Sequence, residues 1–356
     1  MIDTEVLQPG TGAIRSKIYL SAQAGNVLWG RLPCETDVPV LTVDAGDEVT
    51  IDTISHEGIL EDQGRDPLVF FGKFGVPPGQ VLDDAIAIAA SHYPRDRIND
   101  GPHVVTGPIH VRGARPGDLL KIVVLETLPR VPYGVISNRH GRGVLSGEYP
   151  VGDDSVSVFA AVDGAFGTMP RVLGGDHTIR FPLKPFLGIM GVAVAGAERP
   201  HSVPPGAFGG NIDINLLTVG SSLYLPVQVA GALAYIGDPH FAQGDGEVAL
   251  TAMEASLRVT LRFELICEDD AIAAFGRQLG PLAETADFLV PTGLDLDLDL
   301  AVKNCVRAAI ALLQVRFGMD AAHAYAYLSA ATDFNISQVV DVVSGVHARI
   351  RVSDFD

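Results

Sequence analysis

Ionisable side chains gather in one glycine-rich stretch of this sequence, residues 204–254, which reads PPGAFGGNIDINLLTVGSSLYLPVQVAGALAYIGDPHFAQGDGEVALTAME. Asp213 follows a Gly-Gly-Asn turn, and Asp238, His240, Asp245 and Glu247 occupy a later glycine-rich corner. Four ionisable residues within ten, directly after an apolar strand, are more than a turn requires. Carboxylates and imidazoles on a backbone that glycine allows to approach closely suit a metal ion or a general acid/base site.

The residues around this stretch mostly predict strands. The runs at 38–53 and 109–126 each place a turn with Gly and Asp between two apolar segments, and both predict β-hairpin-like units. Their aspartates, Asp47 and Asp118, are interpreted as turn residues. A buried strand is expected over 181–194, and strict alternation over 257–265 predicts a half-buried strand.

Helical patterns are fewer. A short helix is expected over Asp83–Ala90, and apolar residues spaced by three and four predict a longer one from 302, capped by Asp299 and stopped by Gly318. A second helix over 320–330 and a final strand follow. The sequence therefore predicts a mainly β fold, with a sandwich- or barrel-like body and a small C-terminal α+β part. We divide it into residues 1–180, 181–292 with the active-site motifs, and 293–356.

Three segments resemble signature blocks of the acetamidase/formamidase family of amide hydrolases. They are GGNIDIN with the following SSLYLPVQVAGALAYIGDPHFAQGDGE, then TGPIHVRGARPGDLLKI at 106–122, and DFNISQVVD at 333–341. The resemblance spans most of the chain from about residue 38 and implies an enzyme that cleaves the C–N bond of a small linear amide, such as formamide or acetamide, to a carboxylate and ammonia. A same-fold hydrolase of a bulkier amide, lactam or carbamate is the first alternative. A non-catalytic metal- or ligand-binding β protein is the second.

The usual amidase nucleophiles are missing from the sequence. No serine stands in a GxSxG motif, the Ser- and Gly-rich motif of the amidase-signature enzymes is absent, and there is no HExxH. Cys267, at the end of a strand pattern, is followed by Glu268, but nothing else supports a nitrilase-type site. The remaining hypothesis is a water activated by a metal or by a carboxylate.

Asp213, His240 and one further carboxylate, Asp238 in our assignment, are the candidate metal ligands, with one position left for water. A His/carboxylate set suits zinc, whereas an oxygen-rich set would favour calcium, which could be structural. Each residue also has a purely structural interpretation: Asp213 as an Asx turn and His240 as a hydrogen-bonded core histidine.

Glu247 is the candidate general base, and Asp245, which could also be only a turn residue, is the alternate. Asn211, Gln243 and backbone N–H groups are candidates for holding the amide. His103, beside the 106–122 block, is assigned to the substrate site, or else is a capped loop histidine. Trp29 is assigned there too, because the family resemblance leads us to expect an acidic or histidine-bearing sequence near this tryptophan, and the departure NVLWG would alter one pocket wall.

Composition limits the partners. A net charge of −18 without a basic stripe disfavours nucleic acid, anionic membranes and anionic substrates, although solubility alone also explains the acidity. The basic cluster Arg139–Arg142 is interpreted as a solvated loop, with a loop over the pocket or a subunit contact as alternatives. No apolar run reaches the roughly 18 residues of a membrane span, and the N-terminus lacks a signal-peptide core. Together with three widely separated cysteines, this predicts a cytoplasmic protein, and the glycine-rich apolar segments and the family resemblance predict a homo-oligomer.

Overall fold

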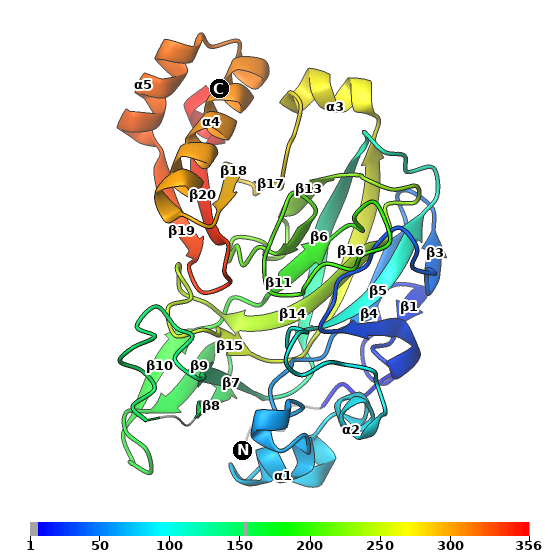
Figure 1. Cartoon of the computed structure of the whole chain (residues 1–356), viewed down its shortest axis with the longest axis vertical. Helices are drawn as coiled ribbons and strands as arrows, with labels where there is room; N and C mark the ends of the chain where they lie inside the picture. Colours follow the sequence, from blue (N-terminus) through cyan, green and yellow to red (C-terminus); the bar gives the residue numbers. More distant parts are fainter. Residues whose placement is uncertain (1–5, 153–154, 356) are drawn as a thin grey trace.

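The computed structural model describes residues 6–152 and 155–355, and most of its strands belong to two large sheets packed over a common core (Figure 1). The strands of the first sheet are β1 (Ile18–Leu20), β4 (Glu48–Asp52), β6 (Leu119–Pro129), β13 (Ser222–Pro226), β16 (Leu257–Ile266), β17 (Leu282–Glu284), β18 (Phe288–Asp295), β19 (Asp333–Gln338) and β20 (Ser344–Arg351). Their spatial order is β1-β4-β16-β6-β13-β17-β18-β20-β19.

The second sheet carries most of the residues discussed below. Its strands are β2 (Val27–Trp29), β3 (Leu41–Val43), β5 (Val104–Val111), β7 (Tyr133–Asn138), β8 (Val156–Asp163), β9 (Phe166–Pro170), β10 (Thr178–Pro182), β11 (Phe186–Gly191), β12 (Gly209–Asn211), β14 (Ala234–Ala242) and β15 (Met253–Glu254). The main path runs β10-β9-β8-β7-β15-β14-β11-β12, and β5 pairs with β14, β2 and β3 beside it.

Strand β16 forms the centre of the first sheet, paired antiparallel with β6 and β4. Its alternating residues Leu257, Val259, Leu261 and Phe263 are fully buried in the core between the sheets. The sequence predicts that the other face of β16 is solvated, and this is wrong for the first half of the strand, because Arg258 is also fully buried. Its guanidinium donates to Asp52 of β4. An arginine can be buried at this depth when its guanidinium is paired and hydrogen-bonded.

The two predicted hairpins are not hairpins. β3 pairs in parallel with β5 in the second sheet, whereas β4, after the Asp44–Asp47 turn, pairs with β1 and β16 in the first. The same change of sheet occurs between β5 and β6. At each of these turns the chain therefore passes from one sheet to the other. Period-two alternation alone cannot distinguish such a change of sheet from a hairpin.

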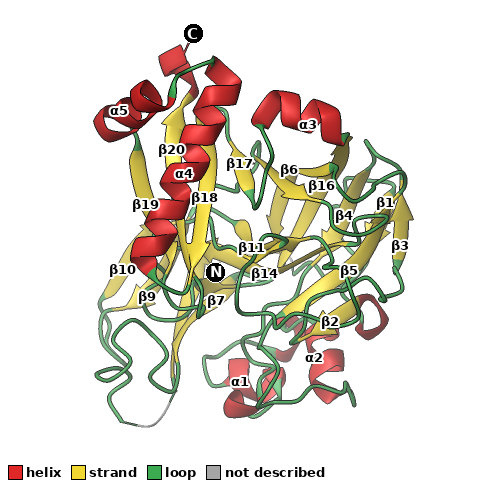
Figure 2. Cartoon of the chain, turned by 45° about the horizontal axis from the view of Figure 1, so that its top comes forward, coloured by secondary structure: helices red, strands yellow, loops and turns green. Residues whose placement is uncertain are grey.

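The helices lie outside the sheets (Figure 2). They are α1 (Pro67–Gly72), α2 (Asp83–Ala90), α3 (Glu268–Phe275), α4 (Leu298–Phe317) and α5 (Ala321–Ala331), with 3₁₀ turns at Ala24–Asn26, Glu61–Gln63, Pro78–Gln80 and Val352–Phe355. α4 packs along β18 and β20 and ends at Gly318 in the left-handed region, as predicted. Its N-cap is Asp297, which accepts from Leu300 N, and not Asp299 as the sequence suggested.

The mainly β prediction is confirmed. The three predicted segments contribute strands to shared sheets, since the first sheet alone takes β6, β16 and β20; the segment boundaries stay a prediction. No helix in residues 6–152 and 155–355 is long and apolar enough to cross a membrane. The first five residues, on which the signal-peptide argument partly depends, lie outside the described residues.

Candidate active site

Strand β14 supplies the centre of the site. Asp238 and His240 are two residues apart on it, so both side chains project from the same face. The register places His240 opposite Glu254 of β15 on one side and Phe186 of β11 on the other. His240 Nε2 lies 3.0 Å from Asp238 Oδ2 and 3.0 Å from Glu254 Oε1.

Loops deliver the other members of what we call the floor cluster. His56 follows β4, His103 precedes β5, and Asp213 follows β12. Glu247 lies in the turn between β14 and β15, and Asp341 lies between β19 and β20. The complete cluster is 0–7% exposed and consists of His56, His103, Asp213, Asp238, His240, Glu247, Glu254 and Asp341.

Three of these residues have an unusual backbone. Asp213, Asp238 and Glu247 all have φ near +48° to +49°, in the left-handed region that residues with a Cβ seldom occupy. Such conformations cost free energy and persist where the surrounding structure enforces them, most often at functional sites. Here the strain aims three carboxyl groups into one volume.

His56 and His103 face one carboxylate oxygen of Asp238, and His240 faces the other. His56 Nδ1 is 3.6 Å from Asp238 Oδ1, and His103 Nε2 is 3.7 Å from the same oxygen. Glu254 Oε2 is 3.9 Å from His56 Nδ1. The spacing is too long for hydrogen bonds, yet it brings imidazole nitrogens and carboxylate oxygens around one point.

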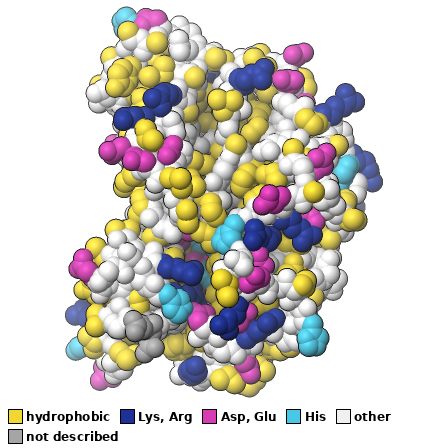
Figure 3. Space-filling view, in the orientation of Figure 1, with side chains coloured by type: hydrophobic (Ala, Val, Ile, Leu, Met, Phe, Trp, Pro, Cys, Tyr) yellow, Lys and Arg dark blue, Asp and Glu magenta, His cyan; other side chains and the backbone are white. Residues whose placement is uncertain are grey.

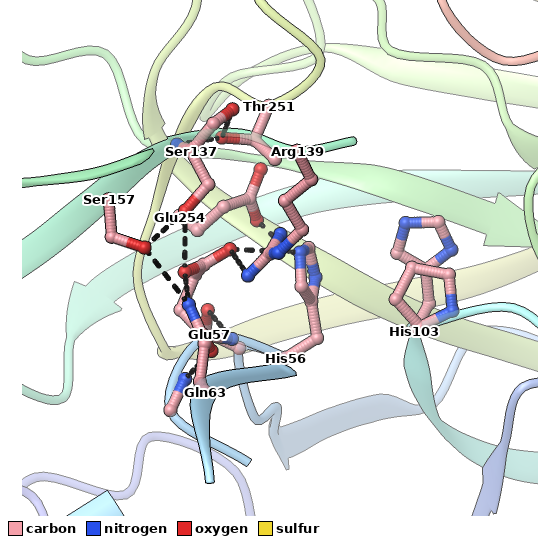
Figure 4. Close-up of polar contacts among 12 residues, drawn as sticks. His56, Glu57, Gln63, His103, Ser137, Arg139, Ser157, Thr251 and Glu254 are labelled. Carbon is pink, nitrogen blue, oxygen red and sulfur yellow. Dashed lines mark hydrogen bonds and ion pairs between the residues drawn. The ribbon is translucent and has the colours of Figure 1, made fainter. Parts of the chain in front are cut away.

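The far nitrogen of each of these two rings is anchored. His103 Nδ1 lies 3.1 Å from Ser202 Oγ, and His56 Nε2 lies 3.4 Å from Glu57 Oε1 (Figure 4). Glu57 is in turn held by Arg139 at 2.6 Å and by Ser137 at 2.8 Å. An imidazole whose outer nitrogen meets a carboxylate or hydroxyl has its ring orientation fixed, and this arrangement is common behind metal-binding histidines.

His240 is oriented in the same way by Gln243. Gln243 Nε2 donates to the carbonyls of Asp213 (2.9 Å) and Ser337 (3.2 Å), so its Oε1, 3.0 Å from His240 Nδ1, accepts from that nitrogen. His240 Nε2 is then left facing Asp238 and Glu254, where it makes no well-directed hydrogen bond. Asp238 and Glu254 thus each direct one oxygen to His240 and the other towards His56.

The pKa values follow from an excess of negative charge. Burial, with the charges of Asp341 and Asp238, raises the pKa of Asp213 well above its usual range. Burial and Asp213 do the same to the pKa of Glu247. Burial alone would lower the pKa of His240, but Glu254 and Asp238 raise it well above its usual range. Each of these three raised pKa values favours the protonated form of its residue, and so a less negative cluster.

Gly188 of β11 makes the convergence possible. A Cβ built at this position would overlap Asp213 Oδ1, Asp238 Oδ2 and the His240 ring. Glycine is therefore required here for space, while its backbone φ is unremarkable for a strand. The same strand carries Phe186, whose ring contacts the edge of His240 with centroids 5.1 Å apart.

The floor cluster fits a metal cation. In the described part of the chain, both oxygens of Asp213 and one each of Asp238, Glu254 and Asp341 are buried without a hydrogen-bond partner, as is His56 Nδ1. No lysine or arginine within those residues pairs with the five carboxyl groups, and three of them, Asp213, Asp238 and Glu254, face His240. Unpartnered buried oxygens are costly unless a cation or proton is shared among them. Imidazole and carboxylate together form a donor set typical of zinc.

The floor cluster lies at the bottom of a cleft of about 800 Å³. His56, His103, Asp238, Glu247, Glu254 and Asp341 line it, together with Asn211, whose Oδ1 is buried without a partner. Figure 3 shows basic and histidine side chains gathered around the hollow on this face. A concave site with convergent polar groups and shifted pKa values is typical of an enzyme active site.

Comparison with known proteins decides the family. The sequence profile of the acetamidase/formamidase family matches residues 95–198 and 193–353. The chain belongs to the acetamidase/formamidase family. This confirms the resemblance stated from the sequence, and it supports the expected reaction class, hydrolysis of the C–N bond in a small linear amide.

Curated members of this family are distant relatives. The formamidase of Methylophilus methylotrophus is 28% identical over 302 residues, covering 67% of this chain and 74% of that one. The acetamidase of Mycolicibacterium smegmatis is 31% identical over 199 residues, covering 41% and 49%. A Schizosaccharomyces pombe relative is 28% identical over 243 residues, covering 53% and 57%. The chain thus spans less than two thirds of the length of two of these three relatives.

Solved structures with a similar fold cover most of this chain. The acetamidase of Bacillus halodurans has a TM-score of 0.73 and 25% identity, with 95% of this chain and 98% of that one covered. A gamma lactamase from Delftia acidovorans has a TM-score of 0.56 and 22% identity, with 95% and 93% covered. The second likeness shows the fold alone.

In this family member, most of the predicted site residues come together. Asp213, Asp238, His240, Glu247 and His103 are all in the floor cluster, and Asn211 lines the cleft beside it. His103, assigned to the substrate, faces Asp238 as one of the candidate metal-binding histidines.

Three predicted residues lie elsewhere. Asp245 is exposed, and its oxygens accept from Asn215 (2.9 Å) and Asn335 (2.6 Å). Gln243 has its amide fully engaged within the protein and positions His240. Trp29 is 1% exposed, and its Nε1 donates to the Pro102 carbonyl. The guanidinium of Arg95, which lines the cleft, lies over the Trp29 ring, so the tryptophan sits behind the cleft wall.

Four residues of the site have no role in the prediction from the sequence: His56, Glu57, Glu254 and Asp341. His56 and Glu57 stand in SHEG directly after a strand, the same signal of ionisable residues beside glycine that identified Asp238 and His240. Asp341 is the last residue of the DFNISQVVD block. Glu254 ends the stretch that opened the argument, but only the pairing of β15 with β14 brings it to His240.

Proposed function

We propose that this protein hydrolyses a small linear amide, of the formamide or acetamide kind, to a carboxylate and ammonia by means of an activated water. The observation that carries the proposal is the floor cluster: a buried set of imidazoles and carboxyl groups with unpartnered atoms, at the bottom of a cleft in a member of an amide hydrolase family. The names of the curated relatives, formamidase and acetamidase, agree with this reaction.

The proposed cofactor is a divalent metal, zinc in preference to calcium. His56, His103 and Asp238 form one candidate set of ligands, and Asp238, His240 and Glu254 form a second. Asp213, the ligand expected from the sequence, belongs to a third set with His240 and Glu247. When bound, the metal would lower the pKa of water and stabilise the negative charge that develops on the amide oxygen.

Glu247 is the proposed general base. It is buried, it lines the cleft, and burial raises its pKa above the ordinary carboxyl range. In its ionised form a carboxylate that lines the cleft can take a proton from water and return it to the leaving amine. Asn211, with its unpartnered Oδ1 in the cleft, would accept a hydrogen bond from the substrate N–H₂ group.

The test is ammonia release from formamide and acetamide by the purified protein, before and after treatment with a chelator. We expect turnover of at least one amide, loss of turnover on chelation, and recovery on addition of zinc. Turnover that survives chelation would overturn the proposed metal cofactor. The remaining mechanism would then be a water activated by a carboxylate. Absence of ammonia from every small amide would overturn the amidase proposal and favour a binding protein.

Two further predictions from the sequence stay proposals. Self-association is tested by sedimentation of the purified protein, where a single species with the mass of one chain would contradict it. A cytoplasmic location is tested by cell fractionation, where recovery with the cell envelope would contradict it.

A further inference from the structure

The rim of the cleft carries a charge opposite to that of the whole chain. Arg95, Arg97, Arg139 and Arg142 line it, together with His140 and His201. Arg139 and Arg142 belong to the basic cluster that the sequence argument favoured as a solvated loop; the structure places it at the cleft. A protein of net charge −18 therefore presents arginines at the entrance to its active site.

The carboxylates of the rim are already neutralised. Glu61 Oε2 lies 2.5 Å from Arg95 Nη1, Asp62 Oδ2 lies 2.8 Å from Arg139 Nε, and Asp100 Oδ1 lies 2.6 Å from Arg31 Nε. Each of these three acids is thus paired with an arginine. They leave little negative charge at the rim to attract a cationic ligand.

Arg97 and Arg142 are different. Both are exposed and line the cleft, and neither takes part in an ion pair with any of the residues that the structure describes. Burial, with the positive charges of Arg31 and Arg142, lowers the pKa of His201, so the Arg142 guanidinium acts within this part of the rim. Two guanidinium groups without carboxylate partners are available to an anion.

The size of the cleft also exceeds what formamide needs. Formamide has one carbon, one oxygen and one nitrogen, whereas a cleft of about 800 Å³ is in the range of roughly 300–1,000 Å³ that encloses much larger ligands. Leu60, Val203 and Leu250 line the cleft as well, and these side chains suit an aliphatic spacer. The acids and histidines of the floor accept the amide, and the space above them is open to the rest of a longer substrate.

We propose that the preferred substrate is an amide that carries a carboxylate at its other end, with Arg97 and Arg142 of the rim binding that carboxylate while the amide group lies at the floor cluster. This inference rests on the proposed amidase function. A guanidinium donates two parallel hydrogen bonds to a carboxylate, which fixes orientation as well as charge. The substrate class is therefore a short-chain monoamide of a dicarboxylic acid.

The net charge of the protein does not prevent this. Salt screens exposed charges beyond about 8 Å at physiological ionic strength, so distant surface acids contribute little to an anion inside the cleft. The nearby paired carboxylates are offset by their arginines. The total charge alone disfavours an anionic substrate, whereas the distribution of charge around the cleft favours one.

The experiment compares succinamate with succinamide, which have the same carbon chain and differ in that a neutral amide replaces the carboxylate. Ammonia release gives kcat/KM for each, at low and high salt. We expect succinamate to exceed succinamide by about tenfold or more at low salt, with the ratio falling as salt rises. Arg142→Gln and Arg97→Gln should each reduce the ratio severalfold. Arg171→Gln, an exposed arginine outside the cleft lining, is the matched control and should leave the ratio unchanged.

The outcomes separate the two proposals. A ratio near one in the wild type, with succinamide or formamide hydrolysed, overturns the acidic-substrate inference and leaves the amidase. A high ratio that Arg97→Gln and Arg142→Gln do not change also overturns the assignment of the rim arginines. Failure to release ammonia from any of these amides overturns the proposed function itself.

Discussion

Two groups of buried charges lie close together in this protein and are organised in opposite ways. The first, which we call the arginine network, consists of Asp52, Asp84, Arg130 and Arg258, all 0–4% exposed. The second is the floor cluster. Strand β4 ends at Asp52 in the first group and leads four residues later to His56 in the second.

The arginine network is almost completely paired. Arg258 donates to both oxygens of Asp52, at 2.6 and 3.0 Å, and Arg130 donates to Asp84 at 2.8 Å. Remaining donors reach backbone carbonyls, such as that of Leu7 at 3.0 Å. The floor cluster has five carboxyl groups, three imidazoles and no arginine or lysine partner in the described part of the chain. A buried network that satisfies itself stabilises the fold, whereas one that leaves oxygens unpartnered has a place for a cation and substrate.

The largest expected effect is on catalysis in the floor cluster. Glu247→Gln removes the proposed base without changing its shape, so kcat should fall by about 100- to 10,000-fold. Asp245→Asn is the matched control, because Asp245 is exposed and held by two asparagines, and its kcat should stay near the wild-type value. Ammonia release measures both. A large loss in Asp245→Asn with none in Glu247→Gln would exchange their roles.

The arginine network should respond in stability. Arg258→Ala leaves the fully buried Asp52 without its two guanidinium hydrogen bonds, and breaking a buried pair costs about 3–5 kcal/mol. Denaturant unfolding measures the loss. The double variant Asp52→Asn/Arg258→Met removes both charges and should recover part of it. A loss below about 1 kcal/mol in the single variant would contradict the distinction drawn between the two groups.

Gly188→Ala tests the space inside the floor cluster. The added Cβ overlaps Asp213, Asp238 and His240, so we expect a loss of stability of about 1–3 kcal/mol together with weaker metal binding. Gly280→Ala is the control, since a Cβ there meets nothing within 4 Å. Unfolding and metal titration by calorimetry provide the two readouts. Unchanged metal affinity in Gly188→Ala would mean that these three side chains are not the ligands.

The smallest effect is a pH dependence of the metal-stripped protein. Burial, with the charge of Glu247, raises the pKa of Asp341 well above its usual range. The folded state therefore keeps a proton that the unfolded state releases above about pH 4, and stability from this group is lost as pH rises through the folded pKa. Asp341→Asn removes that loss. The difference in free energy of unfolding between variant and wild type should shift in favour of the variant from pH 4 upward; a constant difference would refute the shift.

The sequence predicted what depends on local patterns. Strand β16, helices α2 and α4 and the Asp238–His240 pair all follow from spacing within one segment. The crossings after β3 and β5 escaped prediction because sheet membership depends on partners far along the chain. Glu254 and Asp341 escaped for the same reason. Glu254 ends the glycine-rich stretch and Asp341 ends the DFNISQVVD block, but only β-sheet pairing and loop packing bury them beside His240 and Asp213.

The arginines at the cleft show the same limit on charge arguments. Arg139–Arg142 is a local feature of the sequence, but its position beside Asp62 and Glu57 is a product of the fold. The total charge of the chain gave no information about the sign of the charge at the rim.

Metal binding by the floor cluster is the property on which the proposed chemistry depends most. Elemental analysis of the purified protein, after dialysis against metal-free buffer, measures this directly for the wild type and for His103→Ala. We predict at least one equivalent of zinc per chain in the wild type and a marked loss in the variant, because His103 Nε2 faces Asp238 within one candidate ligand set. A wild-type protein that contains no divalent metal, binds none on addition, and still releases ammonia at its full rate would contradict the account.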